Sequence, residues 1–147
     1  MRSTETCVFC EIIAGESPVS MIYQDQHVVA FMDIHPVNRG HVLVVPRSHV
    51  AALADLDEEL GGILFQAGMR VAAAIRRAEI RCEGINLFLA DGSAAGQEVF
   101  HVHLHVIPRF SGDGFGFRFA PSYFQPTSRA SLDEAAASIR LALEGGC

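Results

Sequence analysis

The sequence predicts an α+β fold with a mainly antiparallel sheet of about five strands, one long helix and one short helix. Segments with strand-like patterning come in hairpin-like pairs, not in the regular βαβ alternation of a parallel sheet. One long stretch with helical spacing separates these pairs, and a shorter one lies near the end of the chain. Half of the 147 residues are apolar, which is enough for one domain with a core that needs no disulfides.

Five segments have the composition of strands and end at turn- or loop-forming residues. Asp25 marks a short turn, Pro36 and Gly40 break a loop, and Pro46 and Pro108 stop the segments that they end. The predicted strands are 21–25, 27–33, 41–46, 85–90 and 98–108.

Two segments have helical patterns. Apolar residues at helical spacing predict a helix over 56–78, with acidic residues at its start and Arg76 and Arg77 at its end, as the helix dipole favours. Ser131 and Glu134 form a predicted capping box that opens a short last helix, with Gly145 as its stop.

Composition excludes several classes of function. All eleven basic residues are Arg, so Schiff-base catalysis by lysine and a P-loop lysine are excluded. The net charge of −6 argues against broad nucleic-acid binding but permits a small anionic ligand at a local positive site. The polar first ten residues do not resemble a signal peptide, and no run approaches the roughly 18 apolar residues of a membrane span. We therefore expect a cytoplasmic protein without membrane contact.

Three histidines alternate with apolar residues in the predicted strand over 98–108. Because side chains alternate between the faces of a strand, the three imidazoles share one face. Core filling explains them poorly, since each buried ring needs partners for both nitrogens. The pattern predicts a metal site or a catalytic site. The three residues are His101, His103 and His105.

The loop before this strand, 91–97, favours catalysis over metal binding. Its glycines let the backbone approach a ligand, its N–H groups can cradle a phosphate, and the Gln97 side chain can donate a hydrogen bond. A neutral imidazole facing such a loop can attack phosphorus in line, because its pKa is near 6.5. The plainer interpretation of the loop is an ordinary turn between two strands.

Cys7 and Cys10 have the separation of two thiolates on one metal. In a reducing compartment this spacing indicates metal or redox chemistry before a structural disulfide. No βαβ pattern follows the pair, which weakens the thioredoxin-like alternative. A four-coordinate zinc would need two histidines as well, and spacing alone does not choose among the seven: His27, His35, His41, His49, His101, His103 and His105.

Together these segments resemble the histidine triad (HIT) family. HVHLHVI is similar to the family signature, His-x-His-x-His followed by two apolar residues. DIHPVNRGHVLVVPRSH and the opening CVFCEIIAGESP also resemble family segments, so the likeness runs from Cys7 to about Arg109. It implies a single HIT domain over 1–147, with a core at about 7–110 and a C-terminal extension over 111–147. It also implies a homodimer that joins two sheets; Gly61, Gly62 and Gly68 would permit close approach of the long helix, or would only loosen it.

The resemblance assigns the chemistry to the triad. It implies that His103 is the nucleophile that forms a nucleotidyl-histidine, and that His105 bonds the phosphate or the bridging oxygen. It further implies a structural zinc as the cofactor. The zinc ligands would be Cys7, Cys10, His49 and His101.

The resemblance also implies a nucleotide-binding set. Asp33 would bind the ribose hydroxyls, and Gln97 and the N–H of Val99 would hold the α-phosphate. His41 would have a positioning role, whereas His27 and His35 receive none. The base pocket would be lined by Phe9, Ile12, Phe31 and Ile34, for which core packing is the alternative.

Four positions depart from the family or lie outside its shared core. Ala90 stands where the family usually has Asn, and the charge of Asp91 beside it would repel a phosphate unless it points away. Glu98 replaces a leaving-group Ser of some members, and Arg118 in the extension is a candidate second phosphate contact.

The function that follows is cleavage at the α-phosphate of a nucleotide conjugate, as a hydrolase or a nucleotidyl transferase. Phosphoramidates, adenylates and dinucleoside polyphosphates are the expected substrates. The first alternative is a zinc-stabilised purine-nucleotide sensor or interaction module with little turnover. The second is a metalloenzyme whose triad holds a catalytic metal.

Overall fold

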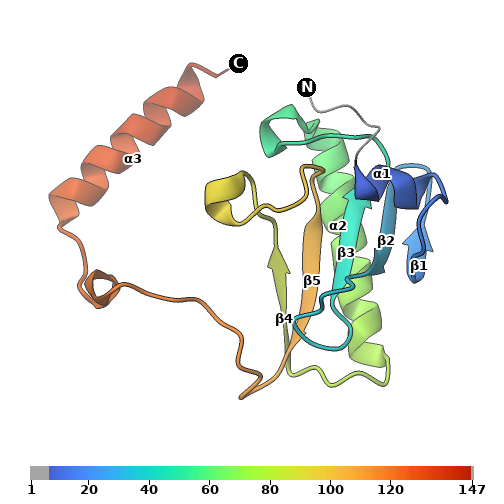
Figure 1. Cartoon of the computed structure of the whole chain (residues 1–147). Coiled ribbons are helices and arrows are strands. Elements are labelled where there is room, and N and C mark those ends of the chain that lie inside the picture. The colour runs from blue at the N-terminus through green and yellow to red at the C-terminus, as the bar shows by residue number, and fades with distance from the viewer. Residues whose placement is uncertain (1–6, 147) are drawn as a thin grey trace. The chain divides into compact units, whose positions relative to one another are not determined.

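The computed structural model describes residues 7–146, which divide after Gly114 into two compact units. The first unit has a five-stranded antiparallel sheet in the order β1-β2-β3-β5-β4 (Figure 1). With its helices it is the predicted α+β architecture. The strands are β1 (Met21–Gln24), β2 (Val28–Met32), β3 (Val42–Pro46), β4 (Gly84–Phe88) and β5 (Leu104–Arg109).

The two faces of the sheet bury alternate residues and carry different helices. One set packs with the long helix α2 (Glu58–Arg77), which contacts β2, β3 and β5. The other set packs with the short helix α1 (Val8–Ile13), which the sequence analysis did not predict (Figure 1). Because Leu104 and Val106 point to the α2 side, His105 between them points to the α1 side.

The long helix begins at Glu58, because the Asp57 side chain caps it by accepting the N–H groups of Glu59 and Leu60. Gly68 in its middle is buried, and a Cβ atom there would lie 2.7 Å from Cδ2 of Leu104. This glycine therefore permits close packing of the helix on its own sheet.

The predicted strand over 98–108 is too long: only Leu104–Arg109 forms a ladder. Pairing with β3 ends at Val44 and Leu104, and Pro46 on the opposite strand has no N–H to extend it. The N–H of Val102 instead donates to the carbonyl of Val50, at 2.7 Å. His101 and His103 thus lie in irregular, buried backbone beyond the strand end.

Gly40 allows the chain to enter β3. Its φ is +98°, and an added Cβ would lie 2.9 Å from Cγ2 of Ile80 and 3.2 Å from Cγ of Pro108. We expect Gly40→Ala to lower the free energy of unfolding by about 2 kcal/mol in urea denaturation. Gly62→Ala is the matched control, because it lies exposed in α2 with open space around it and should raise stability by about 0.5–1 kcal/mol. Equal effects of the two substitutions would contradict this account.

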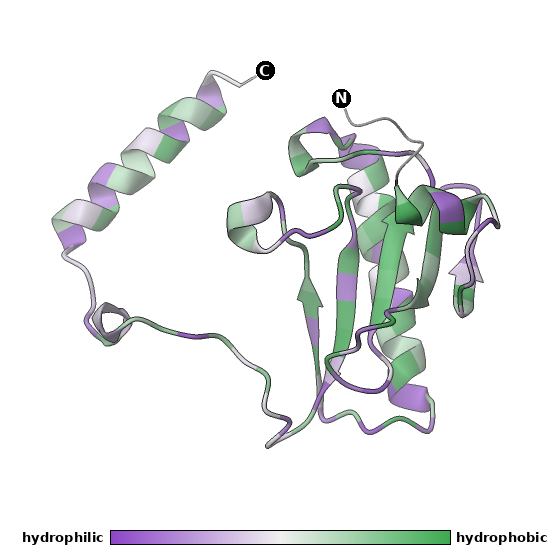
Figure 2. Cartoon of the chain, viewed as in Figure 1, coloured by the Kyte–Doolittle hydropathy of each residue, from purple (hydrophilic) through white to green (hydrophobic). Residues whose placement is uncertain are grey.

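The second unit holds a short 3-10 turn (Pro121–Phe124) and the helix α3 (Arg129–Glu144). The predicted capping box at Ser131 and Glu134 is wrong, because Ser128 is the N-cap and its hydroxyl accepts the N–H of Ser131. The helix therefore starts two residues before Ser131 and has 16 residues. Its larger apolar side chains are exposed within this unit, and hydrophobic residues recur along it (Figure 2).

None of the helices in residues 7–146 is long and apolar enough to cross a membrane. The cytoplasmic location and the division near residue 110 stay predictions.

Candidate functional site

The two cysteines of the CxxC pair meet two histidines from distant parts of the chain. Cys7 precedes α1, Cys10 lies within it, His49 follows β3, and His101 precedes β5. Nδ1 of His101 lies 3.5 Å from Sγ of Cys7 and 3.6 Å from Sγ of Cys10, and Nδ1 of His49 lies 3.3 Å from the same Cys10 sulfur. All four potential ligand atoms lie within 4.8 Å of one another.

This donor set fits zinc. Sulfur and nitrogen ligands of a tetrahedral zinc are about 3.6 Å apart, given Zn–S near 2.3 Å and Zn–N near 2.1 Å. Burial, and then the neighbouring Cys7 thiol, raises the pKa of Cys10 to about 11. A bound divalent cation would offset the free-energy cost of deprotonating this thiol. Nε2 of His101 donates to the Pro46 carbonyl at 2.8 Å, so Nδ1 carries the lone pair that faces the sulfurs.

One ring nitrogen of His103 is hydrogen-bonded to the backbone, and the other is left unprotonated. Its Nδ1 lies 2.7 Å from the carbonyl of His101 and must donate to it, so the lone pair is on Nε2. Burial is the main cause that lowers the pKa of His103, and the ring therefore stays neutral at pH 7. The Phe9 ring packs edge-on at a centroid distance of 5.2 Å and helps to fix the imidazole plane.

His41 and His105 form a hydrogen-bonded pair with defined tautomers. The N–H of Val37 donates to Nδ1 of His41 at 3.0 Å, so the proton of a neutral His41 is on Nε2. That Nε2 lies 2.8 Å from Nδ1 of His105 and donates to it, which places the His105 proton on its own Nε2. The third triad histidine is thereby set as a hydrogen-bond donor. The neighbouring carboxylate of Asp33 lies 3.5 Å from Nε2 of His41.

The same bonds argue against a metal on Asp33, His41 and His105, although their potential ligand atoms also lie within 4.8 Å of one another. A metal on Nε2 of His41 would need the ring proton on Nδ1, where it would face the N–H of Val37. The geometry therefore opposes a metal held by Asp33, His41 and His105.

The titration of His105 gives a testable dependence of stability on pH. Burial, followed by His103 and His41, lowers the pKa of His105 to about 4, whereas an unfolded His titrates near 6.5. Its contribution to stability is therefore complete above about pH 6.5 and is lost as the pH falls through about 4. Between pH 6.5 and 5, wild type should take up as much as about one more proton on unfolding than His105→Gln does. Its free energy of unfolding should therefore fall more steeply than that of His105→Gln as the pH falls. The exposed His27→Gln is the control, and identical slopes in wild type and His105→Gln would contradict the shift.

The loop over 91–97 is stabilised by hydrogen bonds of the Gln97 side chain. The amide oxygen of Gln97 accepts the N–H of Gly92, and its Nε2 donates to the carbonyls of Ala51 and Val99. The buried Gln97 side chain thus has its amide groups engaged within the protein. Asp91 accepts the N–H of Leu53 at 2.9 Å, which explains how a carboxylate is accommodated in this loop.

The predicted base-pocket residues divide into two kinds. Phe9 and Phe31 are buried in the cluster on the α1 side, against which Ile12 and Val99 pack. Ile34 is 85 % exposed.

Ala90 is buried, and Glu98 is exposed beside the triad. Arg118 lies exposed in the second unit.

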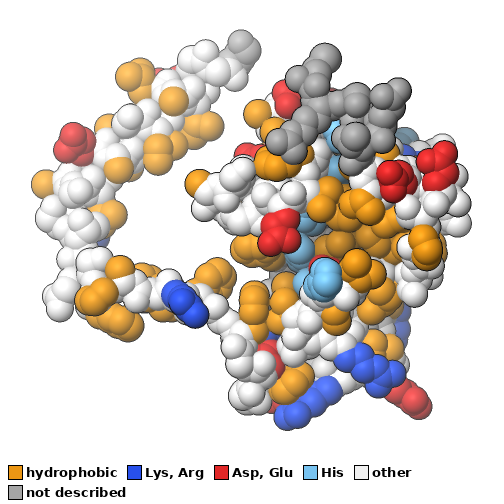
Figure 3. Space-filling model, in the orientation of Figure 1, with side chains coloured by type: hydrophobic (Ala, Val, Ile, Leu, Met, Phe, Trp, Pro, Cys, Tyr) orange, Lys and Arg blue, Asp and Glu red, His pale blue; other side chains and the backbone are white. Residues whose placement is uncertain are grey.

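Two further residues near the triad, Phe88 and Val37, carry no functional signal in the sequence. The Phe88 ring lies 5.7 Å from that of His105, and it is partly exposed at the end of β4. Phe88 lies within the segment 85–90 that is predicted as a strand, which already explains it, and Val37 acts only through its backbone. Histidines reach the surface between hydrophobic side chains on the face drawn in Figure 3.

Comparison with known proteins matches these features. The family model described as the HIT domain matches residues 14–112. The "Protein hit" of Bacillus subtilis is 45 % identical over 117 residues, which are 79 % of this chain and 80 % of that protein. A zinc-bound histidine triad family protein from Mycobacterium smegmatis superimposes with a TM-score of 0.74 at 38 % identity, covering 90 % of this chain and 99 % of that one.

A functionally named relative is the adenylylsulfatase HINT3 of Arabidopsis thaliana. It is 36 % identical over 107 residues, which are 73 % of this chain and 54 % of that protein. With the family-model match over most of the chain and the neighbouring Cys and His groups, these findings lead to one conclusion: the chain belongs to the HIT domain family.

Proposed function

We propose that the protein cleaves nucleotide conjugates at the α-phosphate, with His103 as the nucleophile, and acts as a hydrolase or a nucleotidyl transferase. The observation that carries this proposal is the bond from Nδ1 of His103 to the carbonyl of His101. It leaves an unprotonated Nε2 on a buried, neutral imidazole, which is the state that a nucleophile needs. Membership of a family with a named adenylylsulfatase supports the reaction class.

In the proposed reaction, Nε2 of His103 forms a bond to the α-phosphorus as the bond to the leaving group breaks. The leaving group takes up a proton from the solvent, and the water that attacks in the next step releases one to the solvent. Water then attacks the same phosphorus, the P–N bond breaks, and a nucleoside 5′-monophosphate and neutral His103 result. The Nε2–H of His105 would donate to a phosphate oxygen or to the bridging atom.

For the nucleotide we propose the contacts implied by the family resemblance, with one change. Asp33 binds the ribose hydroxyls, the N–H of Val99 binds the α-phosphate, and His41 positions His105. Gln97 shapes the loop through its internal bonds instead of contacting phosphate, because both groups of its side-chain amide are engaged. The base would lie against Phe9, Ile12, Phe31 and Ile34.

We propose zinc as a structural cofactor held by Cys7, Cys10, His49 and His101. When bound, the ion supplies a cross-link between α1, the segment after β3 and the segment before β5. The residue that links this centre to the reaction is His101, because its ring faces the cysteines while its carbonyl holds His103.

We propose a homodimer that forms through the outer edge of β4. This strand pairs only with β5, so its other edge is open in the described structure. Exposed Leu87 on β4 and exposed Phe65 and Met69 on α2 are apolar. Leu87 lies close to Gly68 of α2, which places the helix and the edge strand side by side.

The test is turnover of adenosine 5′-phosphoramidate, adenylyl sulfate and diadenosine tetraphosphate by the zinc-loaded full chain, with AMP release measured by chromatography. We expect AMP from at least one substrate, and continued turnover during brief exposure to a chelator. Tight AMP binding without AMP release from any of them would contradict the enzymatic proposal and favour a nucleotide sensor. Immediate loss of activity on chelation would instead favour a catalytic metal.

A further inference from the structure

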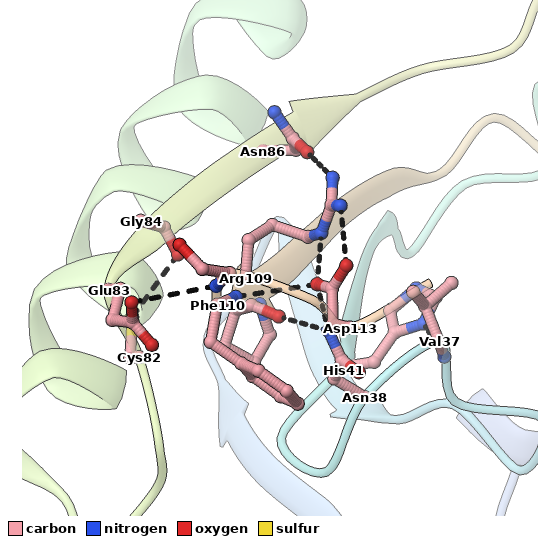
Figure 4. Close-up of polar contacts among 12 residues, drawn as sticks. Val37, Asn38, His41, Cys82, Glu83, Gly84, Asn86, Arg109, Phe110 and Asp113 are labelled. Carbon is pink, nitrogen blue, oxygen red and sulfur yellow. Dashed lines mark hydrogen bonds and ion pairs between the residues drawn. The ribbon is translucent and has the colours of Figure 1, made fainter. Parts of the chain in front are cut away.

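A buried carboxylate lies at the end of β5 remote from His103. The Asp113 side chain is 3 % exposed and accepts Nε and Nη2 of Arg109 at 2.6 and 2.8 Å. It also accepts the backbone N–H of Phe110 at 3.3 Å (Figure 4). Arg109 donates on its other side to Asn86 of β4, at 2.6 Å. Asp113 is thus fixed to the sheet by a bidentate charged pair.

Asn38 connects this carboxylate to the loop that precedes β3. Its side-chain Nδ2 donates to Oδ2 of Asp113 at 2.8 Å and to the carbonyl of Pro108 at 2.9 Å. One amide group therefore uses both of its protons to attach the loop to the end of β5. Figure 4 shows Asn38 between Asp113 and the loop residues Val37 and His41.

The attached loop holds His41 through two backbone groups. The N–H of Val37 donates to Nδ1 of His41, and the carbonyl of Asn38 accepts the backbone N–H of His41 at 3.1 Å. The first of these bonds sets the tautomer of His41 and, through it, that of His105. A loop that moved away from β5 would take the Val37 N–H with it and allow a proton on Nδ1.

We propose that Asn38, anchored by Asp113, is a positioning residue that keeps His41 in its Nε2–H tautomer and so presents His105 as a donor to the substrate phosphate. The relevance to catalysis rests on the proposed function, whereas the effect on the tautomer does not. Asn38 has no hydrogen bond to either histidine side chain in the described structure and acts through the Val37 and Asn38 backbone.

The experiment records long-range ¹H–¹⁵N correlation spectra of histidine-labelled, zinc-loaded full chain, and kcat and KM for the best substrate. Wild type should show His41 and His105 as Nε2–H tautomers, with assignments from His41→Gln and His105→Gln. In Asn38→Ala, His41 should become a mixture of tautomers and kcat should fall about tenfold, with KM changed less than twofold. Asp113→Asn should change the same signals, because the NH2 group of Asn is a donor and cannot accept from Arg109 in place of the second carboxylate oxygen.

Asn86→Ala is the matched control. It removes another partner of Arg109 on the β4 side, without touching Asn38 or its loop. It should leave the tautomers and kcat at wild-type values even if it lowers the melting temperature. An unchanged His41 tautomer in Asn38→Ala, or equal tautomer changes in Asn38→Ala and Asn86→Ala, would overturn the proposal. If wild type has no turnover, the proposed function fails, and the spectra still decide the role of Asn38.

Discussion

Replacing His103 should remove turnover while leaving the fold in place. We expect kcat of His103→Asn to be roughly 10⁴-fold below wild type, since no other described group offers an unprotonated nitrogen in the same position. Asn is the informative replacement, because its amide N–H can still donate to the His101 carbonyl that Nδ1 of His103 contacts at 2.7 Å. The measurement is single-turnover AMP release, together with AMP affinity by calorimetry.

Two further measurements on His103→Asn separate a loss of chemistry from a loss of folding. AMP should still bind to His103→Asn, and the melting temperature should stay within a few degrees of wild type. His27→Asn is the control at an exposed histidine with no proposed role, and its kcat should match wild type. Turnover by His103→Asn within tenfold of wild type would exclude this residue as the nucleophile.

Loss of the proposed zinc should cause the largest loss of stability. At a metal concentration 1,000 times its Kd, a ligand that binds only the folded state contributes about 4 kcal/mol. We therefore expect Cys10→Ser, or prolonged chelation, to lower the free energy of unfolding by about that amount. Thermal and urea unfolding, with metal content by mass spectrometry, measure it.

Cys82→Ser is the matched control for this substitution. Cys82 is part-buried, lies outside the ligand group, and its thiol donates to the carbonyl of Gly84, a bond that serine can retain. It should keep one equivalent of zinc and most of the wild-type stability. Equal zinc content and stability in Cys10→Ser and wild type would show that the cluster holds no structural metal.

Local patterns in the sequence predicted most of the secondary structure. The apolar runs at Val28–Met32 and Val42–Pro46 were strong signals because both faces of these strands are buried. The helical spacing before Arg77 was strong because one face of α2 lies in the core. Two features were mispredicted at segment ends. The ladder of β5 is limited by Pro46 on its neighbour, and the cap of α3 is Ser128, one of two Ser residues near the helix start. The six-residue helix α1 is too short for a periodic signal.

The sequence by itself determined the chemistry that is present: a CxxC pair, a triad of alternating histidines, a glycine-containing loop and no lysine. The tertiary structure decided which of these groups meet. It brings Cys7 to His101 across 94 positions, and it places both beside His49. It also decided the proton positions, because the Val37 N–H, the His101 carbonyl and the Pro46 carbonyl fix the tautomers of three histidines. Every residue offers the same carbonyl, and every residue except proline the same N–H, so no sequence pattern reveals which backbone group will face an imidazole; only the folded chain selects it.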